Sequence, residues 1–354
     1  MIINQWLPTA HWGDAIGDSS RRVRELLRRL GHQSDIYAMD IDAQLANDVL
    51  PFGDPGAGRG DVTIFHYGIQ SPMTAAFAAL PKGRVLQYHN ITPAEFFAPY
   101  DMKISRLVAR GREELSSLVG SVDVGLADSE YNRRELDALG FNRTGVFPVA
   151  VDIDRVKAPA SLPALEAMLD DGVDNVLFVG RMVPNKKIED HIHLAALYSR
   201  YVDTDCRFIF VGRCDVVPRY YSMVRALALR HGLRRDRVIF TGPVPDEELV
   251  IYYQHADVYL SLSEHEGFCV PLVEAMAAGV PVMAYAAAAV PDTLGGAGVQ
   301  FAPKDLVFAA ELLGELTDND TLRADVVAGQ NRRLADFGDG RISRELASLV
   351  GSLS

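Results

Sequence analysis

The sequence predicts an α/β protein with two doubly wound parallel sheets. Three observations favour this class. Short apolar segments alternate with helical patterns along the chain, the alternation restarts near residue 175, and 354 residues exceed what one hydrophobic core usually organises. Hydrophobic residues make up 48% of the chain, which is enough for two large cores, and no low-complexity tract interrupts them.

The first half opens with an apolar strand at residues 1–7 and a turn from Gly13 to Gly17. A helix is expected over 18–30, because apolar residues recur there on one face and Gly31 ends the pattern. Helical patterns then separate five further strands, expected at 35–39, 62–66, 84–89, 122–127 and 144–148.

The second half repeats this alternation after a segment in which Pro159 and Pro163 suit a linker. Its strands are expected at 175–179, 207–211, 237–240, 257–262 and 280–285. Parallel strands joined by helices place their carboxyl ends at one edge of each sheet, so we expect functional residues just after these segments.

Charge and composition exclude several classes. The net charge of −12 argues against a nucleic-acid partner. No apolar run reaches transmembrane length, and the first residues lack the basic start of a signal peptide. Three cysteines without a CxxC pair favour a reduced, cytoplasmic protein. Basic residues nevertheless cluster on two expected helices of the first half: Arg21, Arg22, Arg24, Arg28 and Arg29 on one, and Lys103, Arg106, Arg110 and Arg112 on the other.

The most informative segment follows the strand expected at 257–262. Glu266 and Glu274 stand eight positions apart, with Gly267 and Pro271 between them, a pattern typical of a strand, a turn and a helix start. Backbone N–H groups from Gly267 to Val270 would favour an anion there. Glu274 is placed to chelate the hydroxyls of a ribose and Glu266 to face a sugar ring. The segment therefore suits a nucleotide sugar.

The same residues carry a family resemblance. The sequence EGFCVPLVE, followed by AMAAGVPV, resembles the donor-site signature of the retaining glycosyltransferases of family 4, which have the GT-B fold. A second element supports it, because Gly180-Arg181 closes a strand and Lys186 follows five positions later. In the family this pair holds the donor diphosphate. Lys187 stands where many relatives have glycine.

The resemblance implies two facing Rossmann-like domains with a central cleft. Residues 1–155 would bind the acceptor and 156–339 the nucleotide-sugar donor, with a helix at 340–354 packed back on the first domain. Further donor contacts are implied for Gly13, Gly17, Gly180, Val244, Gly267, Phe268 and Cys269. Plain turn chemistry remains an alternative for the Gly13–Gly17 loop and for Val244.

His89 closes a strand and is similar to the family's active-site histidine, which contacts the transferred sugar. A structural role at the strand end is the alternative for His89, and it is the favoured interpretation of His66. Catalysis is assigned to His89, Arg181, Lys186 and Glu266.

No cofactor or metal is expected. The D-x-D pairs Asp40/Asp42 and Asp203/Asp205 are interpreted as solvated turn carboxylates, and His191-x-His193 lacks a third ligand for zinc.

The sequence thus predicts metal-independent, retaining transfer of a mannose- or glucose-type hexose from a GDP- or UDP-linked donor. The acceptor would be a glycan or lipid-linked glycan of the cell envelope, and peripheral contact with an anionic membrane is expected from the basic clusters. The alternatives are an epimerase-like enzyme and a non-catalytic protein that binds sugar nucleotides.

Overall fold

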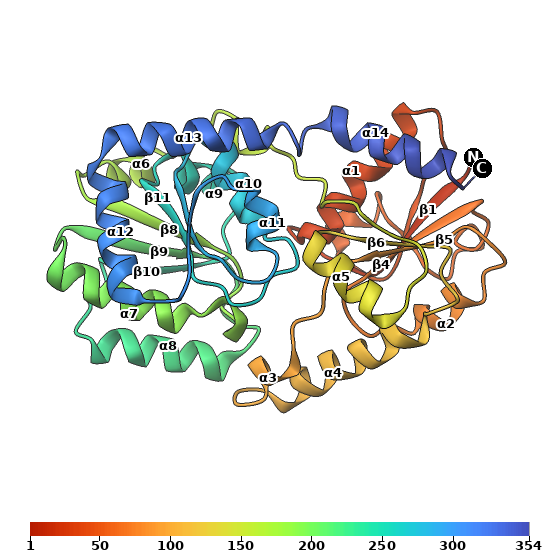
Figure 1. The fold of residues 1–354 in the computed structure, drawn as a ribbon, viewed down its shortest axis with the longest axis horizontal. Coiled ribbons are helices and arrows are strands. Elements are labelled where there is room, and N and C mark those ends of the chain that lie inside the picture. The colour runs from red at the N-terminus through yellow and green to blue at the C-terminus, as the bar shows by residue number, and fades with distance from the viewer. Residues whose placement is uncertain (354) are drawn as a thin grey trace. The chain divides into compact units, whose positions relative to one another are not determined.

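The computed structural model describes residues 1–353, which form two compact units. Unit 1 comprises Met1–Glu95, Met102–Val151 and the terminal segment from Asp336. Unit 2 comprises Phe96–Asp101 and Asp152–Ala335. In each unit, helices lie on both sides of a parallel sheet (Figure 1). The predicted fold class, with its two doubly wound parallel sheets, is confirmed.

The sheet of unit 1 has seven strands in the order β3-β2-β1-β4-β5-β6-β7. Its strands are β1 (Ile3–Ala10), β2 (Ile36–Ile41), β3 (Leu50–Pro51), β4 (Val62–Tyr67), β5 (Arg84–Tyr88), β6 (Val124–Ala127) and β7 (Thr144–Val146). The strand order reverses between β1 and β4, so the loops after these strands diverge there. Such a reversal is where ligands bind in open α/β sheets.

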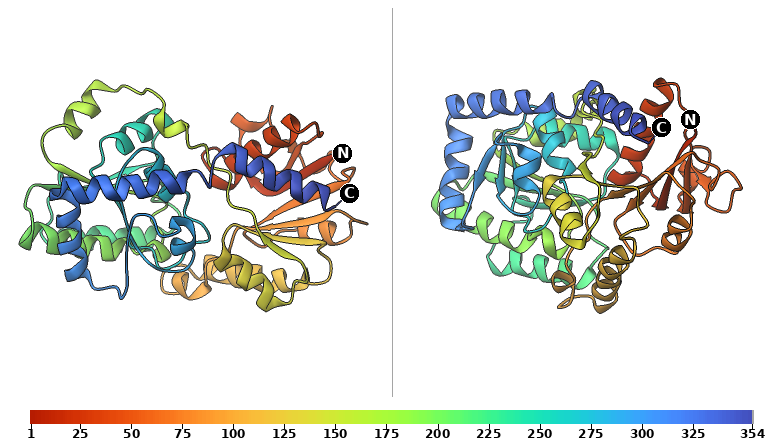
Figure 2. Two further views of the ribbon diagram at one scale, coloured as in Figure 1. Left: turned by 45° about the horizontal axis from the view of Figure 1, so that its top comes forward. Right: turned by 45° about the vertical axis from the view of Figure 1, so that its right-hand side comes forward.

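The helices of unit 1 are α1 (Ala15–Arg29), α2 (Met73–Ala78), α3 (Ala94–Phe97, shared with unit 2), α4 (Met102–Ser117), α5 (Glu130–Leu139) and α14 (Asp339–Gly351). The terminal helix α14 lies beside α1 and the start of the chain (Figure 2). Ile342, Leu346 and Val350 of α14 share one buried cluster with Ile3 of β1 and Val23 of α1. The chain thus returns to unit 1 after completing unit 2.

The sheet of unit 2 has six strands in the order β10-β9-β8-β11-β12-β13, with a reversal between β8 and β11. Its strands are β8 (Asp174–Val179), β9 (Cys206–Val211), β10 (Val238–Gly242), β11 (Val258–Ser261), β12 (Val282–Tyr285) and β13 (Val299–Phe301). Its helices are α6 (Pro163–Leu169), α7 (Ile188–Tyr201), α8 (Pro218–Arg230), α9 (Asp246–Gln254), α10 (Val270–Ala277), α11 (Val290–Leu294), α12 (Leu306–Asp318) and α13 (Asp320–Leu334), with 3-10 turns η2 (Arg155–Lys157) and η3 (Pro184–Lys186).

Several element boundaries differ from the sequence prediction by one to three residues, as in β1, which runs to Ala10 and not to residue 7. The edge strands β3 and β13 are short and were not predicted. Helix α1 begins at Ala15, three residues early, because the Asp14 side chain accepts a hydrogen bond from the Gly17 N–H at 3.3 Å and caps the first turn. Gly17 therefore lies inside the helix and not in the turn. None of the helices within residues 1–353 is both long and apolar enough to span a bilayer.

Candidate functional site

The strand-order reversal of unit 2 brings the two predicted donor motifs to neighbouring strands. Arg181 and Lys186 follow β8, while Glu266 and Glu274 follow β11. These strands pair directly, with Val258 opposite Val176. The motifs are about 80 residues apart in sequence, yet parallel pairing places both at the carboxyl edge of the sheet.

Lys186 and Glu266 form an ion pair in which the Lys186 Nζ lies 2.5 and 2.6 Å from the two carboxylate oxygens. The Glu266 side chain is 7% exposed and that of Lys186 14%. Asn185 holds the two loops together, because its Nδ2 donates to the His265 carbonyl at 2.9 Å and its carbonyl accepts from the Glu264 N–H at 2.9 Å. Asn185 therefore holds the loop that carries Lys186 against the loop that carries Glu266.

Glu274 lies in α10 with a side chain that is only 5% exposed. Arg155 of η2 donates to its Oε1, and the Tyr253 hydroxyl donates to its Oε2 at 2.9 Å. Burial, followed by the Glu274 charge, raises the pKa of Tyr253 well above its ordinary value, so the phenol stays a donor. Each glutamate of the motif thus has its own cationic partner.

Helix α10 begins without a side-chain cap. Cys269 occupies the N-cap position at φ 73°, in the left-handed region, and a proline stands in the first turn. Phe268 and Cys269 are buried and Gly267 is half-buried. Burial and the neighbouring Glu266 raise the pKa of the Cys269 thiol, which therefore remains protonated.

Arg181, Gly180 and Val244 lie at the same edge of unit 2. Arg181 is exposed, and its guanidinium has no ion-pair partner within residues 1–353. Gly180 approaches the end of β9 so closely that a Cβ on Gly212 would lie 2.2 Å from the Gly180 carbonyl oxygen. Val244 is half-buried and follows β10 by two residues.

Lys187 has a backbone conformation that favours glycine. It adopts φ 53° and ψ 50° at the N-cap of α7, a left-handed conformation that L-residues with a Cβ seldom take. Its Nζ lies 3.3 Å from a carboxylate oxygen of Glu264 and 3.6 Å from one of Glu189.

Unit 1 carries a chain of hydrogen-bonded side chains at its own carboxyl edge. His89 Nδ1 lies 2.9 Å from Asp128 Oδ2, and His89 Nε2 lies 2.8 Å from His66 Nδ1. His66 Nε2 continues the chain to Gln5 Oε1 at 3.0 Å. Burial, followed by the neighbouring His89, holds the pKa of His66 well below its ordinary value, so His66 is neutral. Both ring nitrogens of His89 therefore have protein partners, and its side chain is 3% exposed.

The glycine loop after β1 lies at the same edge of unit 1. Gly13 is exposed at φ +72°, a conformation that favours glycine, while Gly17 is buried in the first turn of α1. Gly13 thus lies in a turn and Gly17 lies in a helix.

The D-x-D pairs and the His191-x-His193 segment have other partners. Asp42 accepts hydrogen bonds from the His11 ring and the Trp12 N–H, and Asp205 pairs with Arg237. His191 is buried against backbone groups, and burial lowers its pKa to about 4. Across residues 1–353 no three His, Cys, Asp or Glu side chains gather in a way that could hold a metal ion.

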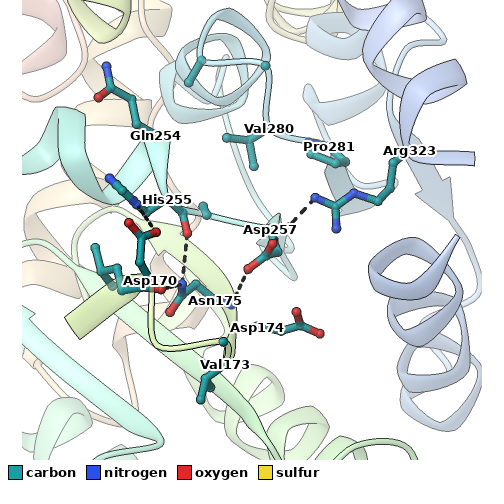
Figure 3. Close-up of a pocket in the computed structure, with 15 residues that line it drawn as sticks. Asp170, Val173, Asp174, Asn175, Gln254, His255, Asp257, Val280, Pro281 and Arg323 are labelled. Carbon is teal, nitrogen blue, oxygen red and sulfur yellow. Dashed lines mark hydrogen bonds and ion pairs between the residues drawn. The ribbon is translucent and has the colours of Figure 1, made fainter. Parts of the chain in front are cut away.

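A pocket of about 570 Å³ lies at the opposite, amino-terminal edge of the unit 2 sheet (Figure 3). Asp174 and Asp257, at the starts of β8 and β11, line it with His255 and Arg323. Asp257 accepts from the Asn175 N–H at 2.8 Å, and His255 pairs with Asp170 at 2.8 Å. No predicted site residue lines this pocket, so we locate the candidate site at the carboxyl edge instead.

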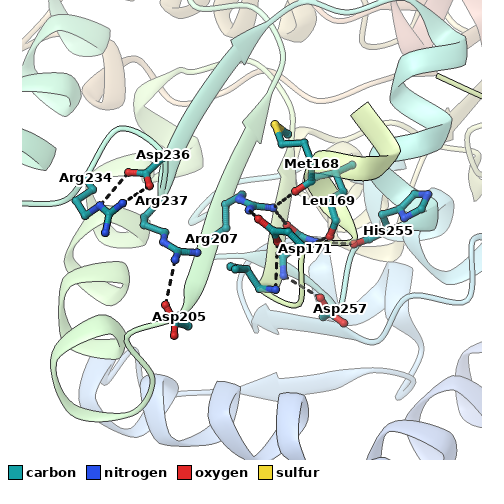
Figure 4. Close-up of polar contacts among 12 residues, drawn as sticks. Met168, Leu169, Asp171, Asp205, Arg207, Arg234, Asp236, Arg237, His255 and Asp257 are labelled. Carbon is teal, nitrogen blue, oxygen red and sulfur yellow. Dashed lines mark hydrogen bonds and ion pairs between the residues drawn. The ribbon is translucent and has the colours of Figure 1, made fainter. Parts of the chain in front are cut away.

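A polar cluster beside this pocket fastens α6 to the sheet (Figure 4). The buried Arg207 of β9 donates to the Met168 carbonyl at 3.0 Å and to Asp171 at 2.6 Å. Met168 lies in the last turn of α6 and Asp171 lies between α6 and β8. Arg207 therefore has a structural role, since it connects this segment to β9.

Comparison with known proteins shows similarity to glycosyltransferases. Residues 167–332, all within unit 2, match the family described as "Glycosyl transferases group 1". The chain is 32% identical over 181 residues to the D-inositol 3-phosphate glycosyltransferase of Corynebacterium diphtheriae, a stretch covering 49% of this chain and 41% of that protein. It is 27% identical over 341 residues to the GDP-mannose-dependent alpha-mannosyltransferase of Mycobacterium tuberculosis, covering 87% and 80%.

Among solved structures, Anabaena HepE in complex with UDP and glucose superposes with a TM-score of 0.74 at 19% identity, covering 100% of both chains. The fold and the family match define the class of GT-B glycosyltransferases. The family match to residues 167–332, the relatives and the solved structures support the resemblance to GT-B glycosyltransferases that the motifs predicted, and they do not specify family 4. The matched stretch spans less than two thirds of several relatives, 41% of the corynebacterial protein and 55% of the O-antigen chain mannosyltransferase B of Escherichia coli.

Three residues of the candidate site were not predicted from the sequence. Arg155 and Tyr253 hold Glu274, and Asp128 holds His89. Asp128 directly follows β6, so its strand-end position at the edge shared with His89 was a usable signal. Arg155 and Tyr253 lie 119 and 21 positions before Glu274 in the chain, and no local pattern marks them.

Proposed function

We propose that this protein transfers a hexose from a nucleoside diphosphate sugar to a hydroxyl acceptor with retention of anomeric configuration. The observation that carries the proposal is the juxtaposition, at the strand-order reversal of unit 2, of Glu266 and Glu274 with Lys186 and Arg181. Cations and a helix start suit a diphosphate, and buried carboxylates suit hydroxyl groups.

Each donor group has a proposed partner in unit 2. The exposed guanidinium of Arg181 and the start of α10 would receive the diphosphate, with Lys186 between them and Glu266. Glu266 would orient the sugar, Glu274 the ribose, and backbone near Val244 the base. GDP and UDP are the proposed nucleotides, since one relative is named GDP-mannose-dependent and HepE was solved with UDP.

The reaction would proceed by displacement on the face that the phosphate vacates. The bond between the anomeric carbon and the phosphate oxygen breaks through an oxocarbenium-like state, and the acceptor oxygen forms the new bond. The departing phosphate takes the acceptor proton, so the nucleoside diphosphate leaves carrying it. Stabilisation of the leaving group's negative charge by Arg181 and Lys186 would supply most of the rate enhancement. For His89 to contact the sugar through Nε2, its hydrogen bond to His66 has to open.

Mutagenesis of the phosphate cations tests the proposal. Arg181→Ala should lower turnover by roughly 100-fold or more, the usual scale for losing one such group. Arg234→Ala is the matched control, because Arg234 is exposed and its ion-pair partner among residues 1–353 is Asp236, near the start of β10. Unchanged turnover in Arg181→Ala would refute the assigned site, and nucleotide binding without glycoside formation would identify a sugar-nucleotide-binding protein.

We further propose that turnover needs no divalent metal, because Arg181, Lys186 and the start of α10 would offset the diphosphate charge. Activity should persist in excess chelator. Activity lost on chelation and restored by Mg²⁺ or Mn²⁺ would refute this and would show that a carboxylate interpreted as structural is a metal ligand.

A glycan or lipid-linked acceptor at an anionic membrane is proposed from helix α4. Met102, Arg106, Leu107 and Arg110 are exposed on it, and neither arginine forms an ion pair within residues 1–353. By contrast, each of the five arginines of α1 pairs with an aspartate: Arg21–Asp18, Arg22–Asp339, Arg24–Asp48, Arg28–Asp35 and Arg29–Asp339. Unpaired cations beside apolar side chains suit a surface of anionic headgroups.

Flotation with vesicles of neutral and anionic lipid tests the membrane proposal. The wild type should float with anionic vesicles at low salt, and Arg106→Gln/Arg110→Gln should float much less. The control Arg28→Gln/Arg29→Gln, which removes the same charge from α1, should float like the wild type. Absence of flotation at any salt concentration would indicate a soluble acceptor.

A further inference from the structure

Arg155 lies outside both sequence motifs but contacts one of them directly. We propose that Arg155, together with Tyr253, is a positioning residue that holds the Glu274 carboxylate ready to accept both hydroxyls of a ribose vicinal diol. This proposal rests on the proposed function, in which unit 2 binds a nucleoside diphosphate sugar. It adds a residue from η2 to the nucleotide site.

The geometry fixes the carboxylate at both oxygens. One nitrogen of the Arg155 guanidinium contacts Glu274 Oε1, and the Tyr253 hydroxyl donates to Oε2 at 2.9 Å. The other terminal nitrogen of Arg155 donates to Asp246 Oδ1 at 3.2 Å. Because Asp246 lies in the first turn of α9, the guanidinium is anchored independently of Glu274.

The hydrogen-bond capacity of Glu274 leaves room for a diol. A carboxylate oxygen has two acceptor positions, and each Glu274 oxygen accepts one hydrogen bond from the side chains of residues 1–353. A vicinal diol presents two donors at the spacing of one carboxylate. Arg155 and Tyr253 thus occupy one position on each oxygen and leave one for each ribose hydroxyl.

Burial explains why one of the two donors is a cation. The Glu274 side chain is 5% exposed, and an ionised carboxylate at that depth needs a neighbouring positive charge. Without Arg155 the buried carboxylate would lose the donor that fixes its Oε1 and could rotate, which would take an acceptor away from the diol. Arg155 is itself 27% exposed, so it can be replaced without disturbing a packed core.

The test compares nucleotides that differ only in the diol. Binding of GDP and UDP and of their 2′,3′-dideoxy analogues is measured by calorimetry for the wild type, Arg155→Met, Arg155→Lys and Tyr253→Phe. The wild type should prefer the ribonucleotide by about 100-fold or more, the scale for two hydrogen bonds to a charged group. Arg155→Met should lose that preference while binding the dideoxy analogue like the wild type. Arg155→Lys should restore part of the preference for the ribonucleotide. Tyr253→Phe should reduce that preference at least twofold.

The outcomes separate this inference from the proposed function. Equal wild-type affinity for ribose and dideoxy forms would remove the ribose role of Glu274 and the inference with it. A diol preference that survives in Arg155→Met would overturn the positioning role alone. Tighter ribonucleotide binding in Arg155→Met would overturn it too, since the guanidinium would then compete with the ribose. Should Arg155→Met fail to fold, Tyr253→Phe decides by the same ratio, and Arg234→Met controls for loss of a surface charge.

Discussion

The carboxyl edges of the two sheets are built from different chemistry on the same topology. Each sheet is parallel and reverses its strand order once, and each gathers polar side chains where its strands end. In unit 1 the chain Gln5–His66–His89–Asp128 joins two histidines and a glutamine to one carboxylate. Unit 2 uses two glutamate–cation pairs instead, Lys186–Glu266 and Arg155–Glu274.

This difference sets how each edge tolerates substitution. Removing one member of a buried ion pair leaves an uncompensated charge, whereas removing a neutral hydrogen-bond partner leaves an unsatisfied dipole. The first is more costly. We therefore expect unit 2 to respond more strongly than unit 1 to single substitutions at its edge, and a series of variants can measure that.

The largest effect is expected for Lys186→Met. It leaves Glu266, 7% exposed, without its cation, which should cost about 3–5 kcal/mol of stability and lower turnover roughly 100-fold or more. Arg181→Met should lower turnover equally but leave the urea midpoint unchanged, because Arg181 is exposed and has no ion-pair partner within residues 1–353. Adding Glu266→Gln to Lys186→Met should recover much of the lost stability. If Lys186→Met unfolds at the wild-type midpoint, the pair contributes nothing and the comparison fails.

The corresponding substitution in unit 1 should cost less. His66→Leu removes neutral hydrogen bonds to Gln5 and His89 and leaves their atoms unsatisfied, which should cost about 1–3 kcal/mol. The urea midpoints of His66→Leu and Lys186→Met, measured side by side, give the contrast directly. A larger loss in His66→Leu would mean that the histidine chain, and not the ion pairs, dominates edge stability.

Acid should destabilise both units through buried histidines. Burial lowers the pKa of His66 well below normal and that of His191 to about 4, so both are neutral in the folded protein. The unfolded chain binds protons on them below about pH 6.5, so stability is complete above that pH and falls as the pH drops towards 4. For His191 alone the loss between pH 7 and pH 5 should be about 2 kcal/mol. Urea unfolding of wild type and His191→Gln at both pH values checks this, and an equal loss in the variant would assign the pH effect to other groups.

The sequence predicted the fold and the residues whose partners are local or belong to a known motif. Strand–helix alternation predicted all but two short edge strands. The spacing of Glu266 and Glu274, with Arg181 and Lys186, predicted residues that the structure places on neighbouring strands. These motifs can be recognised in a single sequence because each lies within one continuous strand–loop–helix segment.

Contacts across the fold could not be predicted in this way. Arg155 reaches Glu274 across 119 positions, and nothing in the sequence around it indicates a buried partner. The sequence also placed basic clusters on two helices. In the structure the arginines of α1 pair with aspartates, and Arg22 and Arg29 pair with Asp339 more than 300 positions away. Pairing of charges depends on side-chain geometry, which composition does not encode.

The smallest expected effect concerns backbone strain at the edge of unit 2. Lys187 is held at φ 53°, a conformation that glycine takes at no steric cost, so Lys187→Gly should be more stable than Lys187→Ala by about 1 kcal/mol. Both variants lose the same contacts with Glu264 and Glu189, so their difference isolates the backbone. Arg134 on α5 of unit 1 provides the control, because it is exposed in a regular helix, where glycine should be less stable than alanine by about 1 kcal/mol. Urea midpoints of the four variants should therefore show opposite signs at the two positions. The same sign at both would mean that the left-handed turn before α7 relaxes without cost when its side chain is removed.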